Sequence, residues 1–274
     1  MNSDIVDLRE FYASPLGFAA ARAIASALTP LWQPISEERL LGLGYTLPYL
    51  DRFGADCERT LAFMPATQGA VGWPIGAPSR TALVGAEDLP LGDASIDRLL
   101  MVHALEFAES PLDMLTEAWR VLAPGGSVVV VVPNRRGLWT RFEHTPFGSG
   151  RPWSRGQLSR LMREAMFTPS AWSEALLFPP FRRRSLFSLA GPLERIGRRA
   201  WPVFAGVVVI VATKHVYRGV PVASTSRERR RLVRPVLVPQ GAGAHRAGPG
   251  GGPASLSPAA RVTPRRDGLS SRLP

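Results

Sequence analysis

The chain has 274 residues, a formal net charge of +11 and a single cysteine, Cys57. One cysteine excludes an intrachain disulfide framework and a metal site built from cysteines. The length is enough for one large domain with a sizeable core, and no apolar run reaches the ~18 residues that a membrane-spanning helix needs.

The positive charge is concentrated at one end of the sequence. Residues 221–274 contain ten arginines against Glu228 and Asp267, a net charge of +8, so residues 1–220 carry only +3. This basic segment is rich in Arg, Gly, Pro and Ser and contains no Phe, Tyr or Trp, a composition typical of disorder. We expect no dedicated nucleic-acid site there, because such sites usually combine basic with aromatic residues.

Composition also bears on origin and compartment. The bias toward Arg, Ala, Gly and Pro is typical of a GC-rich, bacterial genome. The low cysteine count fits a reducing compartment, and the acidic start "MNSDIVDLREFY" lacks the basic-then-apolar pattern of a secretory signal. These features favour a cytoplasmic protein.

The predicted elements begin with a helical segment over residues 4–28, where apolar residues recur every three to four positions. Pro30 and Pro34 end this segment. From residue 39 onward, strands and helices alternate. The predicted strands are residues 39–44, 59–65, 81–85, 96–105, 127–133, 170–178 and 203–217. The predicted helices are residues 47–54, 110–126, 154–167 and 183–200, the last interrupted at Gly191-Pro192.

This alternation predicts an α/β domain, a Rossmann-like doubly wound sheet of seven mainly parallel strands. The apolar strands at 96–105 and 127–133 should be buried on both faces, and the last two strands could form an antiparallel edge. We expect three regions: an N-terminal helical cap (1–35), the domain (36–217) and a disordered tail (218–274).

The stretch "RLLGLG" (39–44) joins a strand to a short helix through Gly42 and Gly44. A glycine turn after the first strand of a doubly wound sheet lets the backbone approach a bound nucleotide closely. The alternative is a plain tight turn, because the third glycine and the acidic residue of a full nucleotide motif are missing. Both interpretations stay open on this stretch alone.

A longer stretch, residues 86–134, contains three ordered pieces. They are the loop "AEDLPLGDASID", the strand end, helix and turn "HALEFAESPLDMLTEAWRVLAPGG", and the strand "SVVVVVPN". Together they resemble the second half of a class I S-adenosylmethionine-dependent methyltransferase of type 11, the ubiquinone-biosynthesis-like small-molecule group. The later "RPWSRGQLSRLMREAMF" and "GVVVIVATKHVY" resemble the segments at that group's last two strands, so the resemblance spans residues 36–217.

The resemblance implies S-adenosyl-L-methionine as cofactor and a small molecule as methyl acceptor. It places the turn after the first strand against the methionine part and the ribose, and the segment after the third strand beside the adenine. The cofactor-binding residues it implies are Gly42, Gly44, Tyr45, Met64, Gly85, Ala86, Glu87 and His103.

The role of His103 stays open between a contact near the sulfonium or acceptor and a packed histidine satisfied by a backbone partner. It is a candidate catalytic base only if the acceptor must lose a proton, since methyl transfer itself depends on positioning. Glu87 is favoured as a contact over Asp88, although both acids could simply be solvated.

The chain departs from the family pattern at four positions. They are Leu40 at the acid of the first motif, Thr46 at the third glycine, Met64 near the ribose-binding acid and Gly85 at the adenine-loop acid. Two lost charge-assisted hydrogen bonds, ~1.5–3 kcal/mol each, would weaken binding ~100-fold or more. Gln68 for the ribose and Trp73 for the adenine are candidate substitutes.

The sequence therefore favours a methyltransferase acting on an unidentified small molecule. The alternative is a catalytically degenerate protein of the same fold that serves as a binding or regulatory partner, and a third option is a nucleic-acid or anionic-surface binder acting through residues 221–274. We expect no metal site, because the isolated pair Glu143-His144 lacks a third ligand. The oligomeric state cannot be predicted from the sequence.

Overall fold

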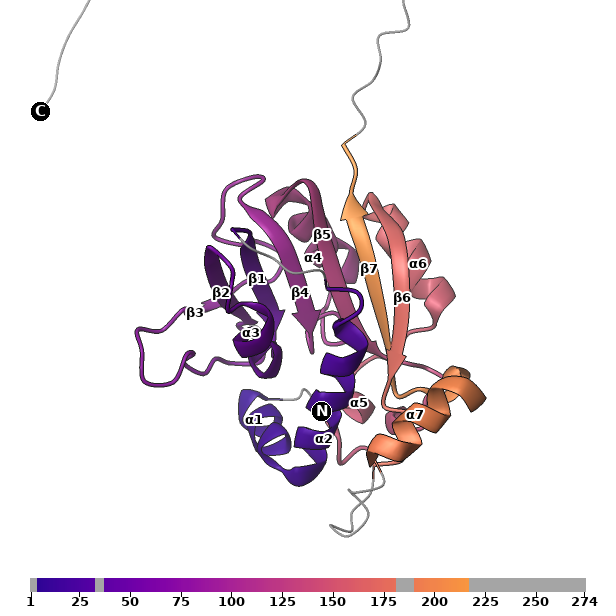
Figure 1. The fold of residues 1–274 in the computed structure, drawn as a ribbon. Coiled ribbons are helices and arrows are strands. Elements are labelled where there is room, and N and C mark those ends of the chain that lie inside the picture. Colours follow the sequence, from indigo (N-terminus) through magenta and orange to yellow (C-terminus); the bar gives the residue numbers. More distant parts are fainter. Residues whose placement is uncertain (1–3, 33–36, 181–189, 217–274) are drawn as a thin grey trace, which may run out of the picture. The chain divides into compact units, whose positions relative to one another are not determined.

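The computed structural model describes residues 4–32, 37–180 and 190–216 (Figure 1). The predicted disordered tail, residues 218–274, lies outside the described residues, as do residues 183–189 of the last predicted helix. The division of the chain into three regions therefore stays a prediction.

Among the described residues, seven strands form one sheet in the order β3-β2-β1-β4-β5-β7-β6. The strands are β1 (Arg39–Gly44), β2 (Arg59–Pro65), β3 (Thr81–Val84), β4 (Ile96–Val102), β5 (Leu122–Pro133), β6 (Phe167–Ala175) and β7 (Val207–Lys214). β1 to β5 pair in parallel, whereas β7 is antiparallel to both β5 and β6. The predicted fold class is confirmed, and the chain order of the strands reverses between β1 and β4, where such sheets bind ligands.

Helices cover both faces of this sheet (Figure 1). They are α1 (Ile5–Ala13), α2 (Pro15–Leu28), α3 (Leu47–Phe53), α4 (Pro111–Val121), α5 (Pro146–Ser149), α6 (Arg155–Glu164) and α7 (Ala190–Ala200), with 3₁₀ turns at Trp139–Arg141 and Pro202–Phe204. Among these residues, no helix is long and apolar enough to span a membrane.

Two apolar clusters hold the layers together, one on each face of the sheet. Successive strand residues point to opposite faces, so Leu40 packs with α2 and α3 while Leu41 packs with α4 and α6. Both leucines are fully buried. This double burial explains why the central strands are continuously apolar in sequence.

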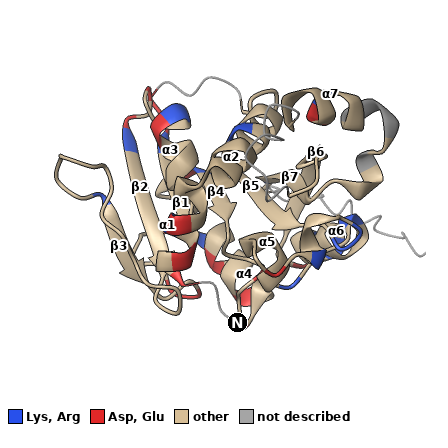
Figure 2. Cartoon of the chain, turned by 90° about the horizontal axis from the view of Figure 1, so that it is seen from below, with Lys and Arg blue, Asp and Glu red and all other residues tan. Residues whose placement is uncertain are grey.

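The segment predicted to be helical, residues 4–28, is helical but is divided into two helices that meet at Ser14. The backbone of Ser14 is extended and its Oγ accepts a hydrogen bond from Gly17 N at 3.0 Å, which caps α2. Pro15 takes the first helical position, where its missing N–H costs nothing. The break lets α1 lie across the edge where the parallel strands end, which Figure 2 views from below.

Other boundaries shift by a few residues. Gly191 and Pro192 lie near the start of the described helix α7, and the residues before Ala190 lie outside the described residues, so the interruption predicted there stays a prediction. β6 begins at Phe167 rather than residue 170, and β5 begins at Leu122, so it includes the turn expected to stop the preceding helix. The short helix α5 was not predicted.

Candidate functional site

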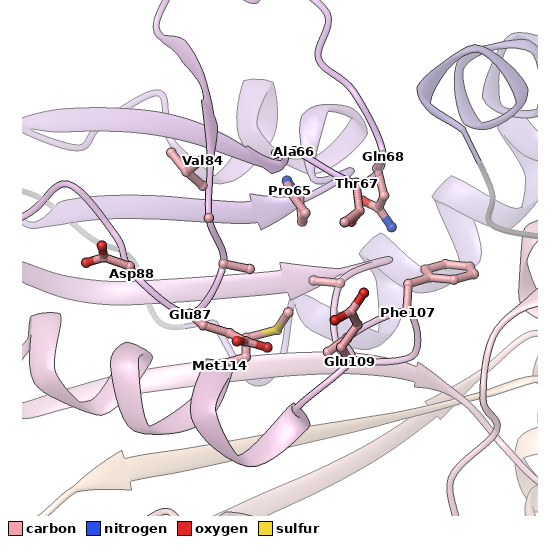
Figure 3. Close-up of a pocket in the computed structure, with 14 residues that line it drawn as sticks. Pro65, Ala66, Thr67, Gln68, Val84, Glu87, Asp88, Phe107, Glu109 and Met114 are labelled. Atoms are coloured by element: carbon pink, nitrogen blue, oxygen red, sulfur yellow. The ribbon is translucent and has the colours of Figure 1, made fainter.

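A cavity of about 250 Å³ lies at the carboxyl ends of β2, β3 and β4 (Figure 3). Residues 65–68 begin with the last residue of β2, residues 84–88 begin with the last residue of β3, and residues 107–109 lie between β4 and α4; Ala104 and Met114 complete the lining. β2 and β3 each contribute their last residue and the loop that follows, and β4 contributes the loop that leads to α4. This is the edge of a doubly wound sheet at which ligands bind.

The cavity brings together some of the residues singled out from the sequence. Gly85, Ala86 and Glu87 line it, and so does the candidate ribose contact Gln68. The residues singled out that do not line it are Gly42, Gly44, Tyr45, Met64, Trp73 and His103.

Two of those residues are engaged elsewhere in the domain. Met64 is buried in β2, and its Sδ accepts a hydrogen bond from Val71 N at 3.4 Å. The indole of Trp73 donates to Asp51 Oδ1 at 2.8 Å, which directs this ring toward α3 rather than over the cavity.

The two glycines of the β1 turn are surrounded by the protein itself. A Cβ on Gly42 would lie 2.1 Å from Thr46 Oγ1, and a Cβ on Gly44 would lie 2.3 Å from the carbonyl oxygen of Val102. Gly44 also has a φ of +86°, a conformation that favours glycine. Glycine is needed at these two positions because the turn packs closely against Thr46 and the end of β4. The sequence had suggested that the glycines make room for a ligand instead.

His103 directly follows β4 and is fully buried, with a φ of +53°. Its Nδ1 lies 3.0 Å from Glu106 Oε1, and its Nε2 lies 2.9 Å from the hydroxyl of Tyr12. Its carbonyl oxygen accepts a hydrogen bond from Gln68 Nε2 at 2.8 Å. Both ring nitrogens are thus satisfied by side chains, and the backbone of His103 is tied directly to a residue of the cavity.

Tyr12 of α1 covers His103 from the outside. Its ring stacks on Tyr45 with the centroids 5.2 Å apart, and its hydroxyl lies 3.4 Å from that of Tyr49. Burial and the neighbouring Tyr49 raise the pKa of Tyr12, so this phenol stays protonated at neutral pH. On the other side, the ring of Phe147 in α5 lies 4.9 Å from the imidazole.

Three carboxylates line the cavity, and they are oriented differently. Glu87 Oε1 accepts a hydrogen bond from Ser110 N at 3.2 Å, at the start of α4. The side chain of Asp88 points away from Thr67 and Gln68, whereas the Glu109 carboxylate points toward that end of the cavity (Figure 3). Among the described residues, Glu109 has no hydrogen-bond or ion-pair partner.

Sequence reasoning missed several residues of this region. Glu109 looked like an ordinary acid in front of a helix, and nothing in the sequence connects Tyr12 with His103, which is 91 residues away. Glu106 could have been suspected, because it lies three residues after His103. Within the described part of the chain, no three His, Cys, Asp or Glu side chains gather to hold a metal ion.

The segment that forms this cavity matches a known protein family. The model of a family described as "Methyltransferase domain" matches residues 42–130, the segment that contains the whole cavity. The chain has the fold of class I methyltransferases. The family resemblance predicted from residues 86–134 is therefore confirmed.

Solved methyltransferases share this fold at low sequence identity. A protein of Thermotoga maritima, described as an S-adenosylmethionine-dependent methyltransferase and possible histamine N-methyltransferase, is 21% identical, with a TM-score of 0.52 over 75% of this chain and 94% of that one. An S-adenosylmethionine-dependent methyltransferase of Mesorhizobium loti is 12% identical, with a TM-score of 0.51 over 70% and 99% of the two chains. These identities support the methyltransferase fold alone.

One curated relative matches in sequence. An uncharacterized protein of Methanocaldococcus jannaschii is 30% identical over 98 residues, which are 35% of this chain. The matched segment spans 43% of that protein's length.

Proposed function

We propose that this chain is an S-adenosylmethionine-dependent methyltransferase that acts on a small-molecule acceptor. The observation that carries the proposal is the cavity at the carboxyl ends of β2, β3 and β4, inside the segment that the methyltransferase family model matches. A cytoplasmic location and a bacterial origin, both expected from composition, belong to the proposal.

The residues of the cavity fit the nucleoside part of the cofactor. Val84, Ala108 and Met114 offer apolar surface for a flat base, while Thr67 and Gln68 offer polar groups at the other end. The bound cofactor supplies a methyl group activated by its sulfonium. The protein then has to bind and orient the two reactants, which is the main requirement of such a transfer.

The methionine part of the cofactor must extend beyond the cavity, because pockets for ligands of this size usually measure ~300–1,000 Å³. Toward β1, the neighbouring space is filled by Tyr12, Tyr45 and His103. Binding of the complete cofactor therefore requires α1 to shift. We place the acceptor on the same side, between α1 and residues 138–153.

Titration with S-adenosylhomocysteine by calorimetry tests the proposal. We expect binding to the wild-type chain and its loss in Ala108→Trp, which would fill the cavity. The matched control is Ala77→Trp, because Ala77 is exposed and lies outside the cavity. No detectable heat and no thermal shift at millimolar ligand would rule the proposal out.

The alternative is a protein that keeps the fold and has lost catalysis. It is favoured by two departures from the family pattern, since Leu40 and Met64 are apolar and buried where the family has acids. Transfer of a labelled methyl group to any acceptor in a cell extract would exclude this alternative. Binding of S-adenosylhomocysteine without any transfer would support it.

The tail-binding option concerns residues 221–274, which lie outside the described residues. Removal of this segment should abolish salt-sensitive binding to nucleic acid if the option holds. The wild-type chain failing to bind nucleic acid at low salt would exclude it.

A further inference from the structure

We propose that Glu109 binds the ribose diol of the cofactor from the loop before α4, in place of a carboxylate at the end of β2. The proposal rests on the proposed function, because it concerns the same cavity. It assigns to one residue a specificity for nucleosides that carry both ribose hydroxyls.

The end of β2 presents neutral groups to the cavity. The strand ends at Pro65, and the polar side chains that follow are Thr67 and Gln68. Gln68 is 4% exposed, and its Nε2 is used by the carbonyl oxygen of His103. Its backbone oxygen accepts a hydrogen bond from Ile5 N at 2.9 Å, which fixes this residue further.

The amide of Gln68 is therefore held with one free acceptor. Among the described residues, no group donates to its Oε1, and the side chain lines the cavity. Because the Gln68 side chain lines the cavity, its Oε1 is available to a ligand that donates hydrogen bonds. The exposed hydroxyl of Thr67 lies beside it.

Of the three carboxylates, Glu109 alone is directed toward this end of the cavity and has no partner among the described residues. Glu87 is engaged by Ser110 N, and Asp88 points the other way. A carboxylate has two oxygens that accept side by side, and two vicinal hydroxyls can donate to both. Glu109 and Gln68 Oε1 together are thus complementary to a cis-diol.

The order of groups along the loop supports this assignment. Ala108 contributes apolar surface to the cavity directly before Glu109, and Met114 adds to it in the first turn of α4. A ligand with a flat base joined to a diol would place its base on this surface and its hydroxyls at Glu109. A nucleoside has that arrangement.

The test measures binding of three ligands to the full chain and to Glu109→Gln. S-adenosylhomocysteine is titrated directly, and adenosine and 2′,3′-dideoxyadenosine are measured as its competitors. The Glu109→Gln substitution should lower the affinity for S-adenosylhomocysteine and for adenosine about tenfold. The affinity of 2′,3′-dideoxyadenosine should stay the same in both proteins, because it lacks the hydroxyls that Glu109 binds.

Glu164→Gln is the matched control, since it makes the same substitution at an exposed glutamate that does not line the cavity. It should leave all three affinities unchanged. Glu109 is exposed, so the substitution should not affect folding, which a thermal melt verifies.

The outcomes separate the two levels of the proposal. If Glu109→Gln binds S-adenosylhomocysteine as tightly as wild type, or weakens all three ligands equally, the ribose assignment to Glu109 is overturned while the proposed function stands. If the wild-type chain binds no S-adenosylhomocysteine, both are overturned.

Discussion

Replacing Gly44 by alanine separates a structural turn from a ligand-binding turn. Gly44 has a φ of +86°, and a Cβ there would lie 2.3 Å from Val102 O and 2.9 Å from the Cβ of Ala104. The left-handed backbone costs about 1–2 kcal/mol for a non-glycine residue, and forcing an atom into a packed site costs about 1–3 kcal/mol more. We expect Gly44→Ala to lower the free energy of unfolding by about 2–5 kcal/mol.

Gly76 provides the matched control for this substitution. Its φ of +77° is close to that of Gly44, but a Cβ on Gly76 would meet nothing within 4 Å. Gly76→Ala should therefore show the backbone cost alone, about 1–2 kcal/mol. Urea denaturation of both variants and the wild type gives the comparison.

Equal destabilisation by the two substitutions would refute the packing argument. If Gly44→Ala is as stable as Gly76→Ala but no longer binds S-adenosylhomocysteine, the turn after β1 contacts the ligand.

Three further predictions concern stability, each checked by urea denaturation. Thr46→Val should be neutral or stabilise by about 1 kcal/mol, because the buried Thr46 hydroxyl has no partner among the described residues; a clear loss of stability would contradict this. Tyr12→Phe should cost about 1–3 kcal/mol by leaving the buried Nε2 of His103 unpaired, and an unchanged midpoint would argue against that hydrogen bond. Asp97→Asn should cost about 1 kcal/mol at pH 7, because hydrogen bonds from Arg39 hold the pKa of Asp97 below its ordinary value. That contribution is present above the unfolded pKa of about 3.9 and is lost as the pH falls through the lowered folded value, so the variant and the wild type should converge at low pH, and a constant difference would refute the ion pair.

The strands could be predicted well because their signals are local. The spans 39–44 and 59–65 match β1 and β2 residue for residue, since apolar runs between polar residues and turns mark buried strands. The break at Ser14 was missed although Ser-Pro is a strong helix start, because the apolar spacing runs across it. At Ser14 the N-cap determines where α2 begins, whereas the spacing of apolar residues determines only which helix faces are buried.

The site could be predicted only in part, for a physical reason. The segment 85–87 was found because it follows a strand that the sequence reveals. The contact of Tyr12 with His103 joins α1 to the residue that follows β4, and side-chain packing between distant elements leaves no periodic pattern in the sequence. Glu109 was missed because a lone acid before a helix is common, and only the fold shows which way it points.

The fold explains why Leu40 replaces the acid of the first motif. Leu40 is fully buried in the cluster beneath α2 and α3, paired in register with Thr60 and Arg98 on the neighbouring strands. A carboxylate at this position would be buried among apolar groups, which is costly without a partner. Leucine therefore stabilises the core at the position where the family has its acid.

Thr46, at the other end of the turn after β1, is the second departure from the first motif. Its side chain packs where a Cβ on Gly42 would lie, so the turn after β1 is closed by protein atoms. The polar side chains that line the cavity follow β2, follow β3 and precede α4, and they include Gln68 and Glu109. We therefore expect most of the binding energy for the cofactor to come from these segments, while the β1 turn packs against the end of β4.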